Sequence, residues 1–302
     1  MLDDRKNNRE GKDWGAWYGR ITEAVNQGEL ETALAICQEA IESLIRSGTL
    51  SDVSNAYHKL GMLTYKLGKY EQAASSYEEA IAIDEQTGDR LGSARSYNNL
   101  SAVFTAQGDF DASVNQLMAS ISIKKEFGDN AGLAASYQQM GVVATAQSDY
   151  STAKDWYLQS LEITQSLCDE VNSIKTYISL KINANYRNDT LEAKMWADKA
   201  MASLDRANSA ELAINLGREA EDQGMLLEAR ELYSKAVSLA EKRSDNVSKS
   251  LSLQYLGALS GIAGEYEFAQ ECFEEALTID ENRNAKDLAA RSRKWLEWLE
   301  GK

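Results

Sequence analysis

Small and apolar residues recur along the chain at the three- and four-residue spacing that defines one face of a helix. One such face consists of Tyr57, Leu60, Gly61 and Thr64. A second face follows it and consists of Ala73, Tyr77, Ala80 and Ile81. Between the two stands Gly68, a residue type that takes the left-handed conformation at a helix end without steric cost. The pattern predicts a hairpin of two helices in which large and small side chains interdigitate.

This hairpin pattern is repeated through the chain. The segment that begins at Gly68 has counterparts that begin at Gly28, Gly108, Ser148, Asn188, Gly224 and Gly264. Successive copies stand 40 residues apart, except that the step from Asn188 to Gly224 is 36 residues (224 − 188). In a repeat array each unit packs only on its neighbours, so the chain grows without a central core. The sequence therefore predicts an all-α solenoid of about seven helix hairpins.

The joints between hairpins are visible as glycine-aspartate pairs. These pairs are Gly88-Asp89 and Gly128-Asp129, with Cys168-Asp169 at the matching place of the following unit. Glycine stops the preceding helix, and the aspartate side chain can accept a hydrogen bond from the first turn of the next helix. We therefore expect helices of similar length joined by short turns.

The two ends of the array differ from the repeats. We expect a flexible segment at 1–13, the seven hairpins over 14–284 and a capping helix over 285–302. Terminal repeats need a cap with a polar outer face to stay soluble. The alternative for the last segment is that Trp295 and Trp298 form an apolar patch that binds a partner or a second copy of the chain.

Charge and cysteine content narrow the possible partners and compartments. The formal net charge is −15, and an acidic surface repels phosphate backbones, so we expect no nucleic-acid partner. The three cysteines, Cys37, Cys168 and Cys272, are odd in number and far apart, which favours a reducing compartment over a disulfide framework. Residues 1–13 lack the apolar core of a secretion signal, and no stretch is apolar enough to span a membrane. We therefore expect a cytoplasmic protein without a membrane partner.

The sequence offers little that could carry catalysis. It holds 1 histidine, His58, so no histidine-based triad is possible elsewhere in the chain. One histidine and three scattered cysteines do not match the spacing of a zinc site. No glycine-rich phosphate loop with the required spacing is present. We expect no catalytic residues, no metal and no cofactor, and hence a protein that is not an enzyme.

At this point the chain resembles the tetratricopeptide repeat family over about 14–279. The best copy matches the family pattern at Tyr57, Leu60-Gly61, Thr64, Gly68, Ala73, Tyr77 and Ala80. The period is longer than the common one of about 34 residues, and the proline that often closes the repeat is absent. The 40-residue variety with Gly-Asp joints is similar to a subgroup that includes the spindle-orienting scaffold rich in Leu-Gly-Asn repeats and many bacterial and archaeal signalling proteins. The resemblance implies a right-handed superhelix whose concave surface, lined by the first helix of each pair, binds a protein or peptide.

Residues offset by one or two positions from the packing face of each first helix should line that groove. The candidates are Asn55, Lys59, Arg95, Asn98, Asn99, Gln138, Gln139, Lys175, Asn185, Tyr186, Asn215, Arg218, Gln254 and Tyr255. Side-chain amides both donate and accept hydrogen bonds, so they could bind the backbone of an extended peptide. The cations could pair with acidic side chains of that peptide. The alternative is that these residues are only the solvated faces of their helices.

Three functions remain open. The first is a non-catalytic scaffold or adaptor that holds a partner polypeptide in the groove. The second is a peptide-sensing regulator; bacterial relatives of that type usually carry a helical output module before the array, whereas only 1–13 precedes the first pair here. The third is self-assembly into a homo-oligomer through the terminal repeats.

The fifth hairpin departs from the pattern. Lys181 replaces the glycine of the first helix, and Ala197 replaces the aromatic residue of the second. The shortened step of the repeat follows directly afterwards. We expect looser packing in this hairpin and a bend between 22–167 and 210–279.

Overall fold

The computed structural model describes residues 14–302, so the expectation for 1–13 lies outside the described residues. All regular elements in this range are α-helices. They are α1 (Trp14–Asn26), α2 (Leu30–Ser47), α3 (Leu50–Lys66), α4 (Tyr70–Thr87), α5 (Arg90–Gln107), α6 (Phe110–Phe127), α7 (Asn130–Ala146), α8 (Tyr150–Ser166), α9 (Glu170–Tyr186), α10 (Thr190–Ala207), α11 (Ala210–Asp222), α12 (Leu226–Arg243), α13 (Asn246–Ile262), α14 (Tyr266–Asn282) and α15 (Lys286–Leu299).

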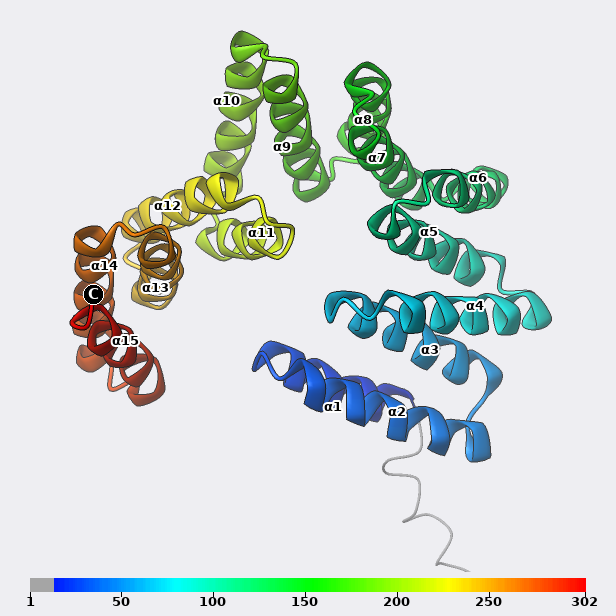
Figure 1. Cartoon of the computed structure of the whole chain (residues 1–302), viewed down its shortest axis with the longest axis horizontal. Helices are drawn as coiled ribbons and strands as arrows, with labels where there is room; N and C mark the ends of the chain where they lie inside the picture. The colour runs from blue at the N-terminus through cyan, green and yellow to red at the C-terminus, as the bar shows by residue number, and fades with distance from the viewer. Residues whose placement is uncertain (1–13) are drawn as a thin grey trace, which may run out of the picture. The chain divides into compact units, whose positions relative to one another are not determined.

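Consecutive helices pack as hairpins, from α1 with α2 to α13 with α14, and α15 follows the last pair (Figure 1). The predicted all-α solenoid of about seven hairpins is confirmed. The chain divides into two compact units, one ending at Leu167 and one running from Cys168 to Lys302. We call them unit 1, with α1 to α8, and unit 2, with α9 to α15, and describe each by itself.

The turns adopt the conformations that the sequence predicts. Gly88 ends α4 in the left-handed region with φ of 78°, and the Asp89 side chain then accepts a hydrogen bond from the Gly92 amide at 2.9 Å. Cys168 takes the same left-handed conformation at the matching joint, with φ of 55°. Asp169 then caps α9. The left-handed backbone conformation is therefore kept at Cys168 where glycine is missing, at the cost of placing a Cβ in a crowded region of backbone space.

Helix pairing depends on complementary side-chain size at two positions 16 residues apart. A Cβ atom on Gly61 of α3 would stand 2.7 Å from the ring of Tyr77 on α4, which is closer than carbon atoms approach in proteins. Glycine therefore makes room for the tyrosine ring. In the first hairpin the sizes are exchanged, since Ile21 on α1 faces Cys37 on α2 and both are fully buried. The total volume at the contact is conserved in the way that tightly packed cores require.

The fifth hairpin has the same order of sizes at these two positions. Lys181 on α9 is the large residue and Ala197 on α10 is the small one. The hairpin nonetheless retains a buried aromatic residue, because Trp196 stacks on Tyr177 with ring centroids 5.8 Å apart. Its indole nitrogen donates a hydrogen bond to Glu192 at 3.1 Å. The expectation of looser packing here stays a prediction for hydrogen exchange.

The shortened step of the repeat falls on α11, which has 13 residues where α9 and α13 have 17. Charged side chains bridge the fifth and sixth hairpins across this joint. The ion pairs are Lys175 with Glu219 at 2.6 Å, Lys181 with Glu231 at 2.7 Å and Lys235 with Asp205 at 2.5 Å. The Lys181 and Lys235 side chains are only 12% and 15% exposed, whereas their acidic partners are 51% and 45% exposed. The joint therefore includes charged contacts, unlike the small-to-large packing within each hairpin.

Helix α15 packs against the last hairpin of unit 2, α13 and α14. The Trp295 indole lies parallel to the ring of Phe273 on α14, with centroids 5.4 Å apart. Leu299 is buried beside them. Trp298 is 40% exposed and meets the edge of Tyr266. The cap proposed for 285–302 rests on the first two contacts, and the patch proposed for the tryptophans rests on the third.

Candidate functional site

A cavity of about 510 Å³ opens in unit 1 along the first helices α3, α5 and α7. Four of the predicted groove residues line it, namely Asn55, Arg95, Asn98 and Asn99. Each comes from the start or middle of a first helix. The other lining residues are Asp89, Leu91, Gly92, Lys124, Asp129, Gly132 and Ala135, so the wall combines three amides, two cations and two carboxylates with small and apolar residues.

Polar contacts link successive first helices across the cavity. Arg95 on α5 donates to the side-chain oxygen of Asn55 on α3 at 3.0 Å. Ser136 on α7 donates to the side-chain oxygen of Asn98 on α5 at 2.9 Å. These partners stand 38 to 40 residues apart because equivalent positions of neighbouring repeats lie side by side. The contacts hold the amides in fixed orientations.

Lys124 is a cavity residue that sequence reasoning missed. It belongs to the second helix α6, is only 5% exposed, and donates to the Ser136 hydroxyl at 2.8 Å. Burial lowers the pKa of its ammonium group to about 8, and the carboxylate of Asp129 acts in the opposite direction. A Cβ on Gly132 would collide with Oδ2 of Asp129 and stand 3.0 Å from the lysine Cε. The glycine in the first turn of α7 therefore makes room first for the Asp129 cap, and it gave no separate sequence signal for Lys124.

The preceding repeat places an acid where α6 places Lys124. Asp84 of α4 is 2% exposed and accepts a hydrogen bond from Ser54 through one carboxylate oxygen. Its other oxygen is buried without a hydrogen-bond partner. Gly92 gives it room, since a Cβ there would stand 2.6 Å from that oxygen. Burial raises the pKa of this carboxyl, and Arg95 acts against the rise.

His58 is enclosed beneath the cavity. It is 8% exposed, and its two ring nitrogens lie 3.0 Å from Ser96 Oγ and 3.2 Å from Asn99 Nδ2. Burial, followed by the positive charges of Arg95 and Lys59, lowers its pKa to about 3. The ring is therefore neutral at physiological pH and is engaged on both sides.

We expect the ring protons of His58 to keep constant NMR chemical shifts between pH 5 and pH 8, where an ordinary histidine titrates. The chain has 1 histidine, so the signal needs no assignment. Because the pKa is lowered on folding, the unfolded chain binds this proton first and the group's contribution to stability is lost as pH falls from about 6.5 towards about 3. A midpoint near 6.5 in the folded protein would show that the ring is solvated instead.

The family assignment follows from the repeat and its residues together. A family model described as the tetratricopeptide repeat matches residues 24–86, 52–126, 92–166 and 205–282. The matches cover more than half of the chain. The protein belongs to the tetratricopeptide repeat family. No curated protein matches the chain.

Solved structures show the same tetratricopeptide fold at low sequence identity. BtubC from P. vanneervenii is 20% identical, with a TM-score of 0.56 over 64% of this chain and 80% of that one. The Rap conjugation gene regulator of plasmid pLS20, solved in complex with the Phr* peptide, is 12% identical, with a TM-score of 0.59 over 91% of this chain and 76% of that one. Aspartyl phosphate phosphatase F from Bacillus subtilis is 12% identical, with a TM-score of 0.61 over 88% and 70%. At these identities the likeness concerns the fold alone.

The prediction that Gln254 of unit 2 lines the groove is wrong. Gln254 occupies the repeat position of Asn98, but it is 1% exposed and is unavailable to a ligand. Its amide donates to the buried carboxylate of Asp280 on α14 at 3.0 Å and to the Leu288 carbonyl at 3.3 Å. The Gln254 side chain lies in the core of the tetratricopeptide hairpin because it binds Asp280 of the second helix.

The remaining predicted residues of unit 2 do not form one site. Lys175 is already paired with Glu219. Tyr255 is half-buried against Tyr233, with parallel rings 5.1 Å apart, and the Arg218 guanidinium lies 5.9 Å from its centroid. The exposed members are Asn185, Tyr186, Asn215 and Arg218. In unit 1, Gln138 and Gln139 are half-buried on α7.

Residues 14–302 contain neither a metal-binding cluster nor a membrane-spanning helix. No group of three or more histidine, cysteine, aspartate or glutamate side chains gathers there in a way that could hold a metal ion. Among the same residues, no helix combines the length and the apolar character that crossing a bilayer requires.

Proposed function

We propose that the protein is a non-catalytic scaffold that holds an extended acidic segment of a partner protein along α3, α5 and α7 of unit 1. The observation that carries the proposal is the cavity of about 510 Å³ in which amides and two cations, Arg95 and Lys124, converge. The two carboxylates in its wall, Asp89 and Asp129, are each engaged as the N-cap of a first helix. Amides can follow a peptide backbone, and the cations can pair with its carboxylates. The regulator of plasmid pLS20, which shares the fold, was solved with a peptide.

The proposal includes the absence of catalysis. The imidazole of His58 is neutral and bonded on both nitrogens, so it lacks the free, near-neutral pKa that acid-base catalysis favours. Burial raises the pKa of the Cys37 thiol to about 12 and that of Cys272 to about 11, which makes both poor nucleophiles. The phosphatase activity named for one structural neighbour belongs to that protein. We place this scaffold in the cytoplasm, because its three cysteines are free, and away from nucleic acid, because its charge is −15.

Binding to degenerate peptides tests the proposal directly. The probes are acetylated, fluorescein-labelled nine-residue pools whose central residue is fixed as glutamate, glutamine or lysine, measured by fluorescence anisotropy with the full chain. We expect the glutamate pool to bind at least about tenfold more tightly than the lysine pool, a difference of about 1.4 kcal/mol. Lys124→Met should remove that preference, whereas Lys194→Met, at an exposed site on α10 of unit 2, should keep it. Equal affinity for the three pools would reject the proposed function.

A further inference from the structure

Gly19 is a glycine that packing does not explain. It lies inside α1, where glycine destabilises a helix relative to alanine. Gly61 and Gly141 are also helical, but a Cβ on either would collide with a tyrosine ring of the partner helix. A Cβ on Gly19 would meet no atom within 4 Å. No neighbouring atom therefore requires glycine at this position, and the space beside its Cα is open.

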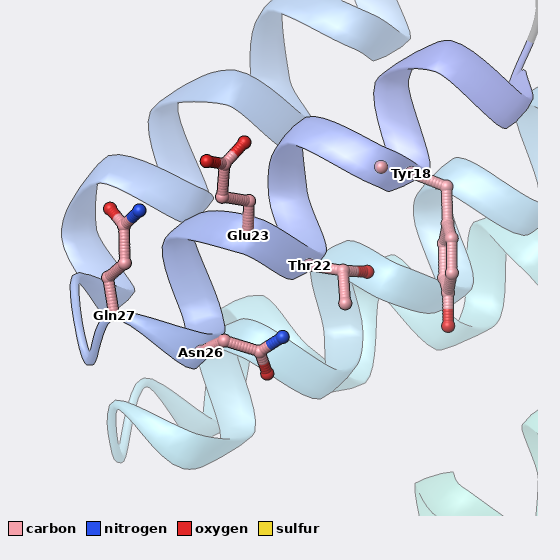
Figure 2. Close-up of a pocket in the computed structure, with 6 residues that line it drawn as sticks. Tyr18, Thr22, Glu23, Asn26 and Gln27 are labelled. Carbon is pink, nitrogen blue, oxygen red and sulfur yellow. The ribbon is translucent and has the colours of Figure 1, made fainter. Parts of the chain in front are cut away.

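That space is part of a hollow of about 450 Å³ on α1, which also borders Tyr18, Thr22, Glu23 and Asn26. Figure 2 shows Tyr18, Thr22 and Asn26 following one another along the helix, with the Tyr18 ring standing clear of the ribbon. Tyr18 is 47% exposed. The Thr22 hydroxyl is buried and has no hydrogen-bond partner. The hollow thus has an aromatic wall beside the bare backbone at Gly19.

The hollow belongs to the same face of unit 1 as the cavity. Tyr18 stands 40 residues before His58 and 80 before Asn98, so it takes their position in the first repeat. The Lys59 ammonium on α3 lies 5.0 Å from the centroid of the Tyr18 ring and joins the two helices. The row of contacts between first helices therefore continues from α7 through α5 and α3 to α1.

We propose that the Gly19 hollow takes a large apolar side chain of the same acidic peptide, and this inference rests on the proposed function. Glycine is the residue type that permits close approach of a ligand to the backbone, and the Tyr18 ring supplies an apolar contact surface. The cations Lys59, Arg95 and Lys124 complement the acidic part of that peptide. The occupant is thus a peptide with one acidic and one apolar anchor.

The spacing of the helices sets the spacing of the two anchors. Packed helices lie about 8–10 Å apart, so two steps from α1 to α5 span about 16–20 Å. An extended chain advances about 3.3 Å per residue. The apolar anchor should therefore stand about five or six residues from the acidic anchor.

The experiment compares peptide pools on variants of the full chain. The probes are acetylated fluorescein-labelled pools with one fixed glutamate and with leucine, tyrosine or alanine fixed six positions away, on either side. We expect wild type to prefer tyrosine or leucine over alanine by at least about tenfold on one side only. Gly19→Leu, which fills the hollow, should abolish that preference and leave the preference for glutamate over lysine intact. Ala35→Leu, which adds the same side chain at an exposed site on α2, should change neither.

Gly19→Ala separates ligand binding from folding. It should raise the thermal midpoint, because alanine favours the helix, and still weaken binding of the apolar anchor. If Gly19→Leu keeps the apolar preference while Lys124→Met loses the glutamate preference, the inference is wrong and the proposed function stands. If Lys124→Met also has no effect, the proposed function itself fails and the inference falls with it.

Discussion

Gly141→Leu is expected to destabilise unit 1 by roughly 3 kcal/mol, at the upper end of the cost of overpacking a well-filled core. A Cβ at this position of α7 would overlap the ring of Tyr157 on α8. The ring is 4% exposed and its hydroxyl lies 3.1 Å from Thr145 Oγ1, so it has little freedom to move aside. Urea unfolding followed by circular dichroism should show the loss as a lower midpoint.

The second half of this prediction is rescue. Tyr157→Ala alone should cost about 3–5 kcal/mol, because it leaves a cavity at a buried site. The double variant should cost clearly less than the sum of the single variants, since the leucine then fills the space left by the tyrosine. In the fifth hairpin the equivalent two positions are held by the long Lys181 and the small Ala197. If the losses of stability of the two single variants simply add in the double variant, then residues 141 and 157 do not fill the same space.

Much of the fold follows from local sequence because the repeat is local. Gly88 and Asp89 determine a turn through their own backbone preferences, and the turn forms as expected. Tyr77 and Gly61 lie within one hairpin, so their pairing is visible from a short stretch of sequence. Trp196 shows the limit of that reasoning. It sits one position before the expected aromatic, yet it still buries its ring against Tyr177.

The candidate site was harder to predict because its residues come from different helices of the repeat. Asn98 and Gln254 occupy the same position of their first helices, and both were expected in the groove. The two amides differ in their contacts because the second helix of one hairpin carries Lys124 and that of the other carries Asp280 at the equivalent position. Asp280 is fully buried and binds the Gln254 amide, whereas Lys124 reaches the cavity that Asn98 lines. The groove residues were predicted from first-helix positions alone, and those positions carry no information about the residue on the second helix.

We expect affinity for the glutamate pool to fall by up to about tenfold per pH unit above about pH 8. The reason is Lys124, whose pKa burial lowers to about 8 in the free protein. Only the protonated amine attracts a carboxylate, so binding above this pH must also supply a proton. Anisotropy titrations from pH 7 to pH 9.5 with acetylated peptides measure the effect.

Lys124→Arg is the matched control, because a guanidinium keeps its charge throughout this range. The variant should bind the glutamate pool with an affinity that hardly changes from pH 7 to pH 9.5. The titration of Lys124 does not unfold the protein in this pH range, so unfolding through this group cannot explain a loss of affinity in the wild type. Its pKa is lower in the folded chain than in the unfolded one, so between about pH 8 and the ordinary lysine pKa of 10.5 the unfolded chain holds more protons and stability rises with pH. A wild-type affinity that stays constant up to pH 9.5 would show that Lys124 does not touch the ligand's carboxylate and would contradict the proposed mode of binding.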